Sequence, residues 1–266
     1  MRFTRRHLFD TLVISASSAL AAPQRKASPP FFLLAGDSTT AVQSAGGGGW
    51  GDGFLNTTLR HGADGINYGH NGATTVSFRE GGDWDRVLAA ARASLPDYQP
   101  YVTIQFGHND QKAEKNISIA EFTANLEQFV EDVRAVPAVP VLVTSLSRRN
   151  YQNNSDGEPR IIENLADVVA GTKQAAADSG TAIIDLNKAS TNYLNAIGPE
   201  NAWTYNLNPD DQTHLNDVGS VVFGNMVAEL LDEELSKLKR WVKPRRKIVK
   251  AIDMGQYIFP VVAREQ

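Results

Sequence analysis

The chain has 266 residues, of which 42% are hydrophobic and 21% charged, proportions typical of a globular protein with one large or two small domains. It contains no cysteine, which excludes disulfides, thiolate metal sites and a cysteine nucleophile. No apolar run approaches the ~20 residues that a membrane-spanning helix needs. Residues 27–236 carry 12 Lys and Arg against 27 Asp and Glu, a net charge of −15, which argues against nucleic acid as a partner.

Residues 1–23 differ in character from the rest of the chain. Arginines stand at positions 2, 5 and 6, a mostly apolar run follows, and Ala19-Leu20-Ala21 supplies the small residues of a cleavage site. This order predicts a signal peptide and therefore a secreted, extracellular protein. Asp10 interrupts the apolar run, so a disordered or anchoring N-terminus is the alternative. The stretch "TRRHLF" also resembles a twin-arginine export signal.

Five short apolar or β-branched runs follow in chain order, with helix-like segments between and after them. The runs are 31–36, 65–69, 101–107, 139–146 and 181–186, and the helix-like segments are 50–62, 83–95, 118–136, 159–180 and 216–240. Continuous apolar runs are typical of strands that are buried on both faces. Their alternation with helices predicts a parallel sheet covered on both sides, in one α/β domain over residues 27–236.

Two of the expected helices carry clear local signals. In the segment 118–136, apolar residues recur at helical spacing and predict one face that enters the core. That face consists of Ile119, Phe122, Leu126, Phe129, Val130 and Val133. Asn216 or Asp217 is expected to cap the last helix at its N-terminus.

The C-terminal residues 237–266 form a basic extension. They carry 9 Lys and Arg against 2 Asp and Glu, a net charge of +7. The simplest expectation is a solvated, partly disordered tail. Contact with a membrane, with a polyanion or with the acidic body of the same chain are the alternatives.

Polar residues gather where the predicted strands end. Gly36-Asp37-Ser38 follows the first run, Gly72 lies in a turn after the second, and Gly107-His108-Asn109-Asp110 follows the third. Asp211 stands three residues before His214, just ahead of the last predicted helix. Because ligands bind at the carboxyl ends of parallel strands, we expect these residues to share one edge of the sheet.

These residue types suit ester hydrolysis. A serine hydroxyl becomes a good nucleophile when an imidazole takes its proton and a carboxylate orients the imidazole. Ser38, His214 and Asp211 would fill these roles. The main-chain N–H groups of Ser38 and Gly72 and the side-chain amide of Asn109 would stabilise the oxyanion of a tetrahedral intermediate.

Each assignment has an alternative at this stage. Serine, aspartate and asparagine often serve only as helix caps or turn residues. The alternatives are a helix cap for Ser38, Asp210 in place of Asp211, Gly69 in place of Gly72, and a turn role for Asn109.

The four blocks resemble those of the SGNH (GDSL-like) hydrolase superfamily over residues 31–235. "AGDSTT", "GWG", "FGHND" and "DQTHLN" look most like its rhamnogalacturonan acetylesterase group. The resemblance implies a flavodoxin-like three-layer α/β/α sandwich with a five-stranded parallel sheet. It implies Ser38 as nucleophile, His214 as base and Asp211 as its partner. It also implies Gly72 and Asn109 as oxyanion donors beside the Ser38 amide, with neither a metal nor an organic cofactor.

The resemblance leads us to expect a secreted serine esterase that removes O-acetyl groups from plant cell-wall polysaccharide, with the pectin rhamnogalacturonan as first candidate. Acetylated xylan and small acyl or lipid esters are the alternatives, because a body of net charge −15 would repel a polyuronate. A binding module that has lost its activity is the alternative of a different class. Two departures weaken the expectation: familiar fungal members have disulfides, and the basic extension is unfamiliar.

Partners and further contacts complete the expectations. Asp37, His108 and Asp110 are candidates for binding the substrate. The expected partner is an acetylated polysaccharide, and the expected assembly is a monomer. Contact of the basic extension with a membrane is less favoured.

Overall fold

The structure is a computed structural model, and it describes residues 28–261. The predicted signal peptide, residues 1–23, lies outside the described residues. The centre of the molecule is a five-stranded sheet in the order β2-β1-β3-β4-β7, in which every neighbouring pair is parallel. Its strands are β1 (Pro30–Gly36), β2 (Asp64–Asn67), β3 (Gln99–Gln105), β4 (Val139–Val143) and β7 (Ala182–Ile184).

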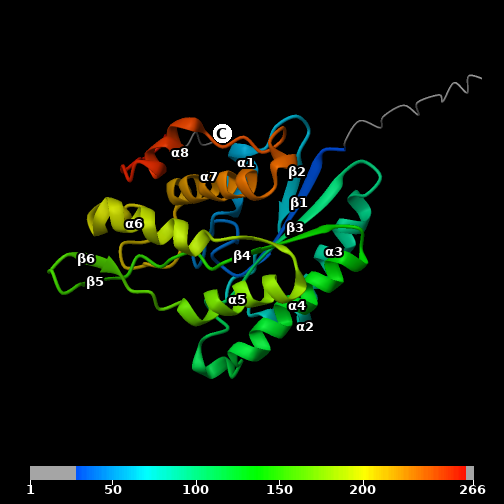
Figure 1. Cartoon of the computed structure of the whole chain (residues 1–266), viewed down its shortest axis with the longest axis horizontal. Coiled ribbons are helices and arrows are strands. Elements are labelled where there is room, and N and C mark those ends of the chain that lie inside the picture. Colours follow the sequence, from blue (N-terminus) through cyan, green and yellow to red (C-terminus); the bar gives the residue numbers. More distant parts are fainter. Residues whose placement is uncertain (1–27, 262–266) are drawn as a thin grey trace, which may run out of the picture.

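Helices cover both faces of this sheet (Figure 1). One layer contains α1 (Gly51–Thr58), α6 (Leu186–Trp203), α7 (Asp217–Glu234) and α8 (Arg246–Asp253). The other contains α2 (Thr75–Glu80), α3 (Asp83–Ser94), α4 (Ile119–Ala135) and α5 (Ala166–Ser179). Strand β1 serves both layers, because Phe32 and Leu34 enter one apolar core while Leu33 and Ala35 enter the other. The predicted three-layer α/β/α sandwich with a five-stranded parallel sheet is confirmed.

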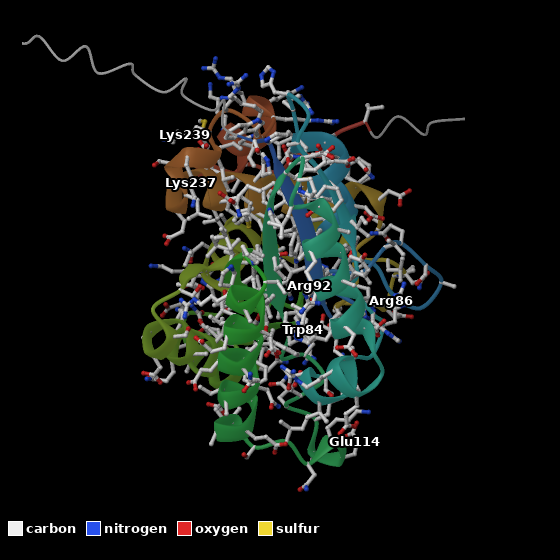
Figure 2. All side chains as sticks on the ribbon, turned by 90° about the vertical axis from the view of Figure 1, so that its right-hand side faces the viewer. Trp84, Arg86, Arg92, Glu114, Lys237 and Lys239 are labelled. Atoms are coloured by element: carbon white, nitrogen blue, oxygen red, sulfur yellow. The ribbon has the colours of Figure 1, made fainter. Side chains whose placement is uncertain are left out.

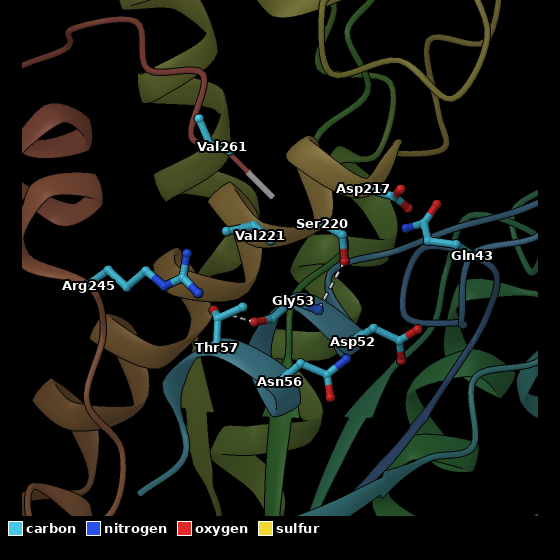
Figure 3. Close-up of a pocket in the computed structure, with 10 residues that line it drawn as sticks. All are labelled: Gln43, Asp52, Gly53, Asn56, Thr57, Asp217, Ser220, Val221, Arg245 and Val261. Atoms are coloured by element: carbon cyan, nitrogen blue, oxygen red, sulfur yellow. Dashed lines mark hydrogen bonds between the residues drawn. The ribbon is translucent and has the colours of Figure 1, made fainter. Parts of the chain in front are cut away.

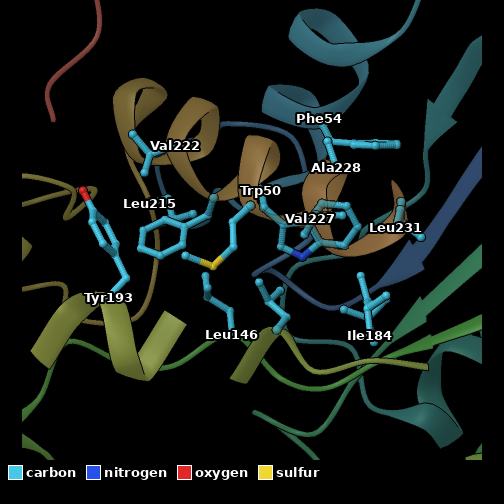
Figure 4. Close-up of a cluster of buried hydrophobic side chains, with 14 of the residues drawn as sticks. Trp50, Phe54, Leu146, Ile184, Tyr193, Leu215, Val222, Val227, Ala228 and Leu231 are labelled. Carbon is cyan, nitrogen blue, oxygen red and sulfur yellow. The ribbon is translucent and has the colours of Figure 1, made fainter. Parts of the chain in front are cut away.

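Helices α1 and α7 pack closely, and this contact positions the functional edge of the sheet. A Cβ atom at Gly53 would overlap the main chain of Ser220, and one at Gly224 would overlap the main chain of Phe54. The Gly53 N–H instead donates to the Ser220 hydroxyl at 3.0 Å. Trp50 and Phe54 lie beside the α7 residues Val227 and Leu231 in the apolar core (Figure 4). The segment after β1 is thereby held against the helix that ends the domain.

Other elements differ from the sequence expectations. A two-stranded antiparallel hairpin, β5 (Tyr151–Asn153) and β6 (Pro159–Ile161), occupies the start of the expected helix 159–180, which begins only at Ala166. The long helix α6 was not anticipated. Ile119 is 38% exposed, so the core stripe of α4 begins at Phe122. Ile119 is the first residue of α4, where the stripe has not yet turned toward the sheet.

The described part of the basic extension packs on the domain rather than extending into solvent as a tail. Leu238 and Val242 are buried in the same apolar core as α1 and α7, and Ile248 of α8 is also buried. Val242 pairs with Leu59 in a β-bridge, and α8 lies along α7 (Figure 1). The apolar residues between the cations explain the difference, since they give the segment a buried face. Lys237 lies in the short 3₁₀ helix η2 (Ser236–Leu238), and Lys239 is the residue that follows this helix (Figure 2).

Within residues 28–261, no helix has both the length and the apolar character that crossing a membrane requires.

Candidate active site

Ser38 lies in a tight turn directly after β1. The turn is held by Asp37, whose carbonyl accepts hydrogen bonds from the N–H groups of Thr40 and Ala41, both at 3.1 Å. No helix begins at this turn, since α1 starts at Gly51 with Trp50 as its N-cap. Ser38 is therefore not a helix cap, and that alternative is removed. Its side chain is available for a partner from elsewhere in the chain.

That partner is His214. The Ser38 hydroxyl donates to Nε2 of His214 at 2.8 Å, and Nδ1 of the same ring donates to Oδ2 of Asp211 at 2.8 Å. Asp210, the alternative partner, is exposed, and no hydrogen bond joins it to His214. The structure thus brings together the three side chains predicted for nucleophile, base and orienting carboxylate. This hydrogen-bond order is the one that ester hydrolysis by a serine requires.

The carboxylate of Asp211 is held in its ionised form. Burial, the largest influence, raises its pKa, but hydrogen bonds outweigh it and the pKa lies below its usual value. The main-chain N–H groups of Thr213 and His214 donate to Oδ1 at 3.0 and 2.9 Å, in addition to the imidazole bond on Oδ2. An ionised carboxylate fixes the proton of the imidazole on Nδ1 and leaves Nε2 free to accept the serine proton.

The loop that carries Asp211 and His214 is anchored from several segments. Asn216 caps α7, with its side chain accepting from Gly219 N–H at 2.9 Å, as the sequence predicted. Leu215 N–H donates to the carbonyl of Gly48 at 2.8 Å, which joins this loop to the glycine-rich segment after Ser38. Arg149 is fully buried beneath the loop and donates to the His214 carbonyl at 2.6 Å.

The main-chain N–H groups predicted to bind the oxyanion, those of Ser38 and Gly72, have no partner within the described residues. Gly69 N–H is occupied, because it donates to Oδ1 of Asn67 at 3.0 Å. Of the two glycines considered, Gly72 is therefore the better candidate. Its φ of +79° is a conformation that glycine adopts without strain.

Asn109 completes this set of donors. Its Nδ2 donates to the carbonyl of Ala73, the residue after Gly72, at 3.0 Å, and its Oδ1 accepts from Lys112 Nζ at 2.8 Å. The amide has two N–H groups, so one remains after the bond to Ala73. The Asn109 side chain is thus tied to the segment that carries Gly72.

The three predicted substrate-binding residues are buried. Asp37, His108 and Asp110 are 0%, 2% and 1% exposed, which argues against direct contact with a substrate. The Asp110 carboxylate accepts from Thr75 N–H at 2.8 Å and from Gly107 N–H at 3.2 Å. It therefore holds the loops around Gly72 and Asn109 together, and the sequence prediction is corrected in this respect.

Asp37 and His108 lie beneath Ser38 and Asn109, the residues that follow them. Nδ1 of His108 is 3.6 Å from Oδ2 of Asp37, beyond hydrogen-bond length. Burial acts most strongly on the Asp37 carboxyl and raises its pKa. The attraction of His108 and the hydrogen bonds from Thr39 outweigh burial and keep the pKa below its usual value. The pair links the ends of β1 and β3 from inside.

Two surface hollows are formed by segments that adjoin the site residues in sequence, and Ser38 lines neither of them. One, of about 540 Å³, is formed by Asn150 and the loop around Asp211. The other, of about 360 Å³, is formed by the segment 67–71 before Gly72 together with Ala41 and Asp83. A further cavity of about 690 Å³ lies between α1 and α7 and does not include the Ser38 site (Figure 3). Within residues 28–261, no three His, Asp or Glu side chains gather as they would around a metal ion.

Two residues of this site, Arg149 and Lys112, were not predicted from the sequence. Neither belongs to one of the four recognised blocks, although Lys112 follows one of them closely. Lys112 stands three residues after Asn109, and this short spacing is the one local signal that could have indicated their contact. Arg149 gives no such signal, because its side-chain partners lie more than fifty residues away in the chain.

The fold and the site together define an ester hydrolase of the α/β class. The model of the GDSL-like Lipase/Acylhydrolase family matches residues 34–221, and the chain belongs to this family. The predicted membership is confirmed, and the protein is a carboxylic ester hydrolase. Rhamnogalacturonan acetylesterase RhgT of Bacillus subtilis (strain 168) is 31% identical over 179 residues, which are 63% of this chain and 73% of that protein.

Solved structures share the fold. Protein YXIM from Bacillus subtilis has a TM-score of 0.65 and 24% identity, with 80% of this chain and 58% of that chain aligned. This chain therefore spans little more than half the length of that protein. The acetylxylan esterase Axe2 from Geobacillus stearothermophilus has a TM-score of 0.56 and 19% identity, with 78% of this chain and 94% of that chain aligned.

Proposed function

We propose that this protein is an exported carbohydrate acetylesterase that removes O-acetyl groups from plant cell-wall polysaccharide, with rhamnogalacturonan as the first candidate. The observation that carries the chemistry is the continuous chain of hydrogen bonds from Asp211 through His214 to Ser38. The similarity to a rhamnogalacturonan acetylesterase over 73% of its length supports the substrate class.

The first half of the reaction transfers the acetyl group to the enzyme. Ser38 Oγ attacks the acetyl carbonyl carbon while Nε2 of His214 takes the hydroxyl proton. The carbonyl oxygen becomes an oxyanion, which the N–H groups of Ser38 and Gly72 and the free N–H of Asn109 would stabilise. As the intermediate collapses, the bond to the sugar oxygen breaks, and that oxygen takes the proton from Nε2.

The second half restores the enzyme. A water molecule attacks the acetyl-enzyme carbonyl while Nε2 of His214 takes one of its protons. The second oxyanion collapses, acetate leaves, and Ser38 Oγ recovers the proton. Asp211 stays ionised throughout, because its hydrogen bonds hold its pKa below the usual value. Its charge stabilises the imidazolium that forms in each half.

Hollows of about 540 and 360 Å³ lie at the loop around Asp211 and at the segment 67–71 before Gly72. We propose that they receive the sugar residues of a polymer whose acetyl group reaches the serine. Residues 27–236 carry a net charge of −15, which opposes a polyuronate at long range and keeps neutral acetylated xylan as the second candidate.

Acetate release tests both parts of the proposal. The wild-type protein and Ser38→Ala are compared on acetylated rhamnogalacturonan, acetylated xylan and a p-nitrophenyl ester series of increasing acyl length. We expect acetate from rhamnogalacturonan at the highest rate, a preference for acetyl over longer acyl groups, and loss of all these activities in Ser38→Ala. Equal rates for the variant would overturn the mechanism, whereas faster release from xylan or faster cleavage of long acyl esters would overturn only the substrate.

The proposal that the protein is exported is based on the signal-peptide pattern of residues 1–23, and it is tested separately. The N-terminal residue of protein recovered from the growth medium should lie just after the small residues at positions 19–21. Retention of the full-length chain in the cells would contradict it.

A further inference from the structure

The amide of Asn109 is held at both ends. Its Nδ2 donates to the carbonyl of Ala73 at 3.0 Å, and its Oδ1 accepts a hydrogen bond from the ammonium group of Lys112 at 2.8 Å. Lys112 reaches it because the chain turns immediately after Asn109, with Lys112 N–H donating to the Asn109 carbonyl at 3.1 Å. The remaining N–H of the amide has its direction fixed by these two bonds.

The charge of Lys112 is not neutralised by a carboxylate. Lys112 is exposed on the surface, and none of the ion pairs among residues 28–261 includes it. The neighbouring Asp110 carboxylate is buried and bonded to Thr75 and Gly107 instead. The one polar side-chain partner that the structure gives to this ammonium group is therefore the Asn109 oxygen.

We propose that Lys112 is a positioning residue of the oxyanion hole, which holds the Asn109 amide with its nitrogen toward the reacting carbonyl and strengthens it as a donor. This inference rests on the serine esterase chemistry proposed above, because it concerns the oxyanion which that chemistry creates. It assigns to Lys112 no contact with the substrate.

Two physical effects support the proposal. An amide that rotates by half a turn would present its oxygen to the oxyanion, and a charged donor on Oδ1 opposes that rotation more strongly than a neutral one. A cation on the carbonyl oxygen also draws electron density from the amide, so that its N–H groups become better donors, as in any hydrogen-bond chain. Both effects grow when negative charge develops, so they lower the barrier rather than tighten substrate binding.

The test compares Lys112→Met, Lys112→Arg and a matched control, Lys115→Met, in the full chain with p-nitrophenyl acetate as substrate. Lys115 is an exposed lysine of the next turn, and the structure gives its side chain no polar partner. We expect Lys112→Met to lower kcat about tenfold with little change in KM, because one charge-assisted bond is lost. Lys112→Arg should retain most of kcat, and Lys115→Met should behave as wild type.

A double-mutant cycle with Asn109→Ala separates positioning from other roles. If Lys112 acts through Asn109, Lys112→Met should have no further effect on kcat once the amide is absent. An unchanged tenfold loss in the Asn109→Ala background would overturn the proposal, as would wild-type kcat in Lys112→Met alone. Thermal unfolding of each variant shows whether a loss of kcat reflects a loss of folded protein.

The variant Ser38→Ala, measured beside Lys112→Met, keeps this inference apart from the proposed function. If Ser38→Ala retains activity, the esterase mechanism itself fails. If Ser38→Ala is inactive but Lys112→Met is unimpaired, only the role of Lys112 fails. A loss confined to acidic polysaccharide, with p-nitrophenyl acetate unaffected, would show that Lys112 binds substrate and would also overturn the positioning role.

Discussion

The fully buried guanidinium of Arg149 donates through Nη2 to the main-chain carbonyl of His214 at 2.6 Å. Its Nε donates to the side-chain oxygen of Asn206, and its main-chain N–H donates to the carbonyl of Gln212 at 2.8 Å. Burial lowers the pKa of Arg149 to about 10, while the charges of Asp211 and Tyr151 oppose that shift. The side chain therefore stays cationic at neutral pH and ties the loop of the imidazole to the interior.

Replacing Arg149 by Met should loosen this loop. The carbonyl of His214 and the side-chain oxygen of Asn206 would lose their donor, and each unsatisfied buried group costs about 1–3 kcal/mol of unfolding free energy. Because the imidazole would no longer be held against Ser38, we expect kcat to fall roughly 10–100-fold. Chemical denaturation and p-nitrophenyl acetate kinetics measure the two effects. Arg160→Met, at an exposed arginine of the hairpin, is the control, and equal behaviour of the two variants would contradict the assignment.

Asp211→Asn tests the orienting carboxylate against its neighbour. The asparagine amide would favour the wrong imidazole tautomer, so that Nε2 carries a proton and cannot accept one from Ser38. We expect a loss in kcat on the order of 10³–10⁴. Asp210→Asn removes the same charge from the adjacent, exposed residue and should leave the hydrolysis of p-nitrophenyl acetate unchanged. A large loss in Asp210→Asn with little effect in Asp211→Asn would reverse the assignment.

Gly72→Ala has a matched control in Gly62→Ala. Both glycines have positive φ, +79° and +83°, and at neither would a Cβ atom meet another atom within 4 Å. Each substitution should therefore cost about 1–2 kcal/mol of unfolding free energy through backbone strain alone. Only Gly72 is assigned as an oxyanion donor, so Gly72→Ala alone should also lower kcat, on the order of 10-fold or more, because its N–H is shifted. Equal activity in the two variants would leave the oxyanion role to other donors.

The sheet and its functional edge were predictable from the sequence for a physical reason. Strands buried on both faces must be apolar almost throughout, and Phe32 to Ala35 show that pattern without any knowledge of their neighbours. The helix α4 was predicted nearly to its ends because its apolar residues recur at helical spacing, and the structure adds a cap at Ser118, whose hydroxyl accepts from Glu121 N–H at 3.1 Å. Residues whose roles follow from their own chemistry, such as Ser38 and His214, were also found.

The roles of some buried polar residues could not be predicted from the sequence, because these roles depend on neighbours from distant segments of the chain. Arginine side chains are mostly exposed in proteins. Arg149 is buried because carbonyl and amide oxygens of residues 206–214 accept hydrogen bonds from its guanidinium group. Asp37 and Asp110 looked like substrate ligands because they are polar residues at strand ends. Both are buried, and their distant neighbours, His108 for Asp37 and Thr75 for Asp110, are brought to them only by the folded loops. The contacts of these three side chains in the fold, and not their residue types, determine whether they are buried.

The carboxylate of Asp132 provides a prediction for the pH dependence of stability, away from the site. It lies on α4 and accepts hydrogen bonds from Trp84 Nε1 and Gln128 Nε2, both at 2.9 Å, and forms an ion pair with Arg79 at 2.8 Å. Burial is the largest single influence and raises its pKa, but these donors together hold the pKa below its usual value. The folded protein therefore binds the proton more weakly than the unfolded chain does, and this difference stabilises the fold at neutral pH.

For a lowered carboxyl pKa, the stabilisation is fully present above the unfolded value, ~4, and is lost as the pH falls through the folded value. We expect Asp132→Asn to lower the unfolding free energy by about 1 kcal/mol at pH 7, a figure reduced for the partial exposure of the pair. The deficit relative to wild type should shrink as the pH falls below about 4. Asp97→Asn, at an exposed carboxylate without a side-chain partner in the structure, should show no such trend. Denaturation curves from pH 3 to 7 measure it, and a deficit that grows toward acid would contradict the direction of the shift.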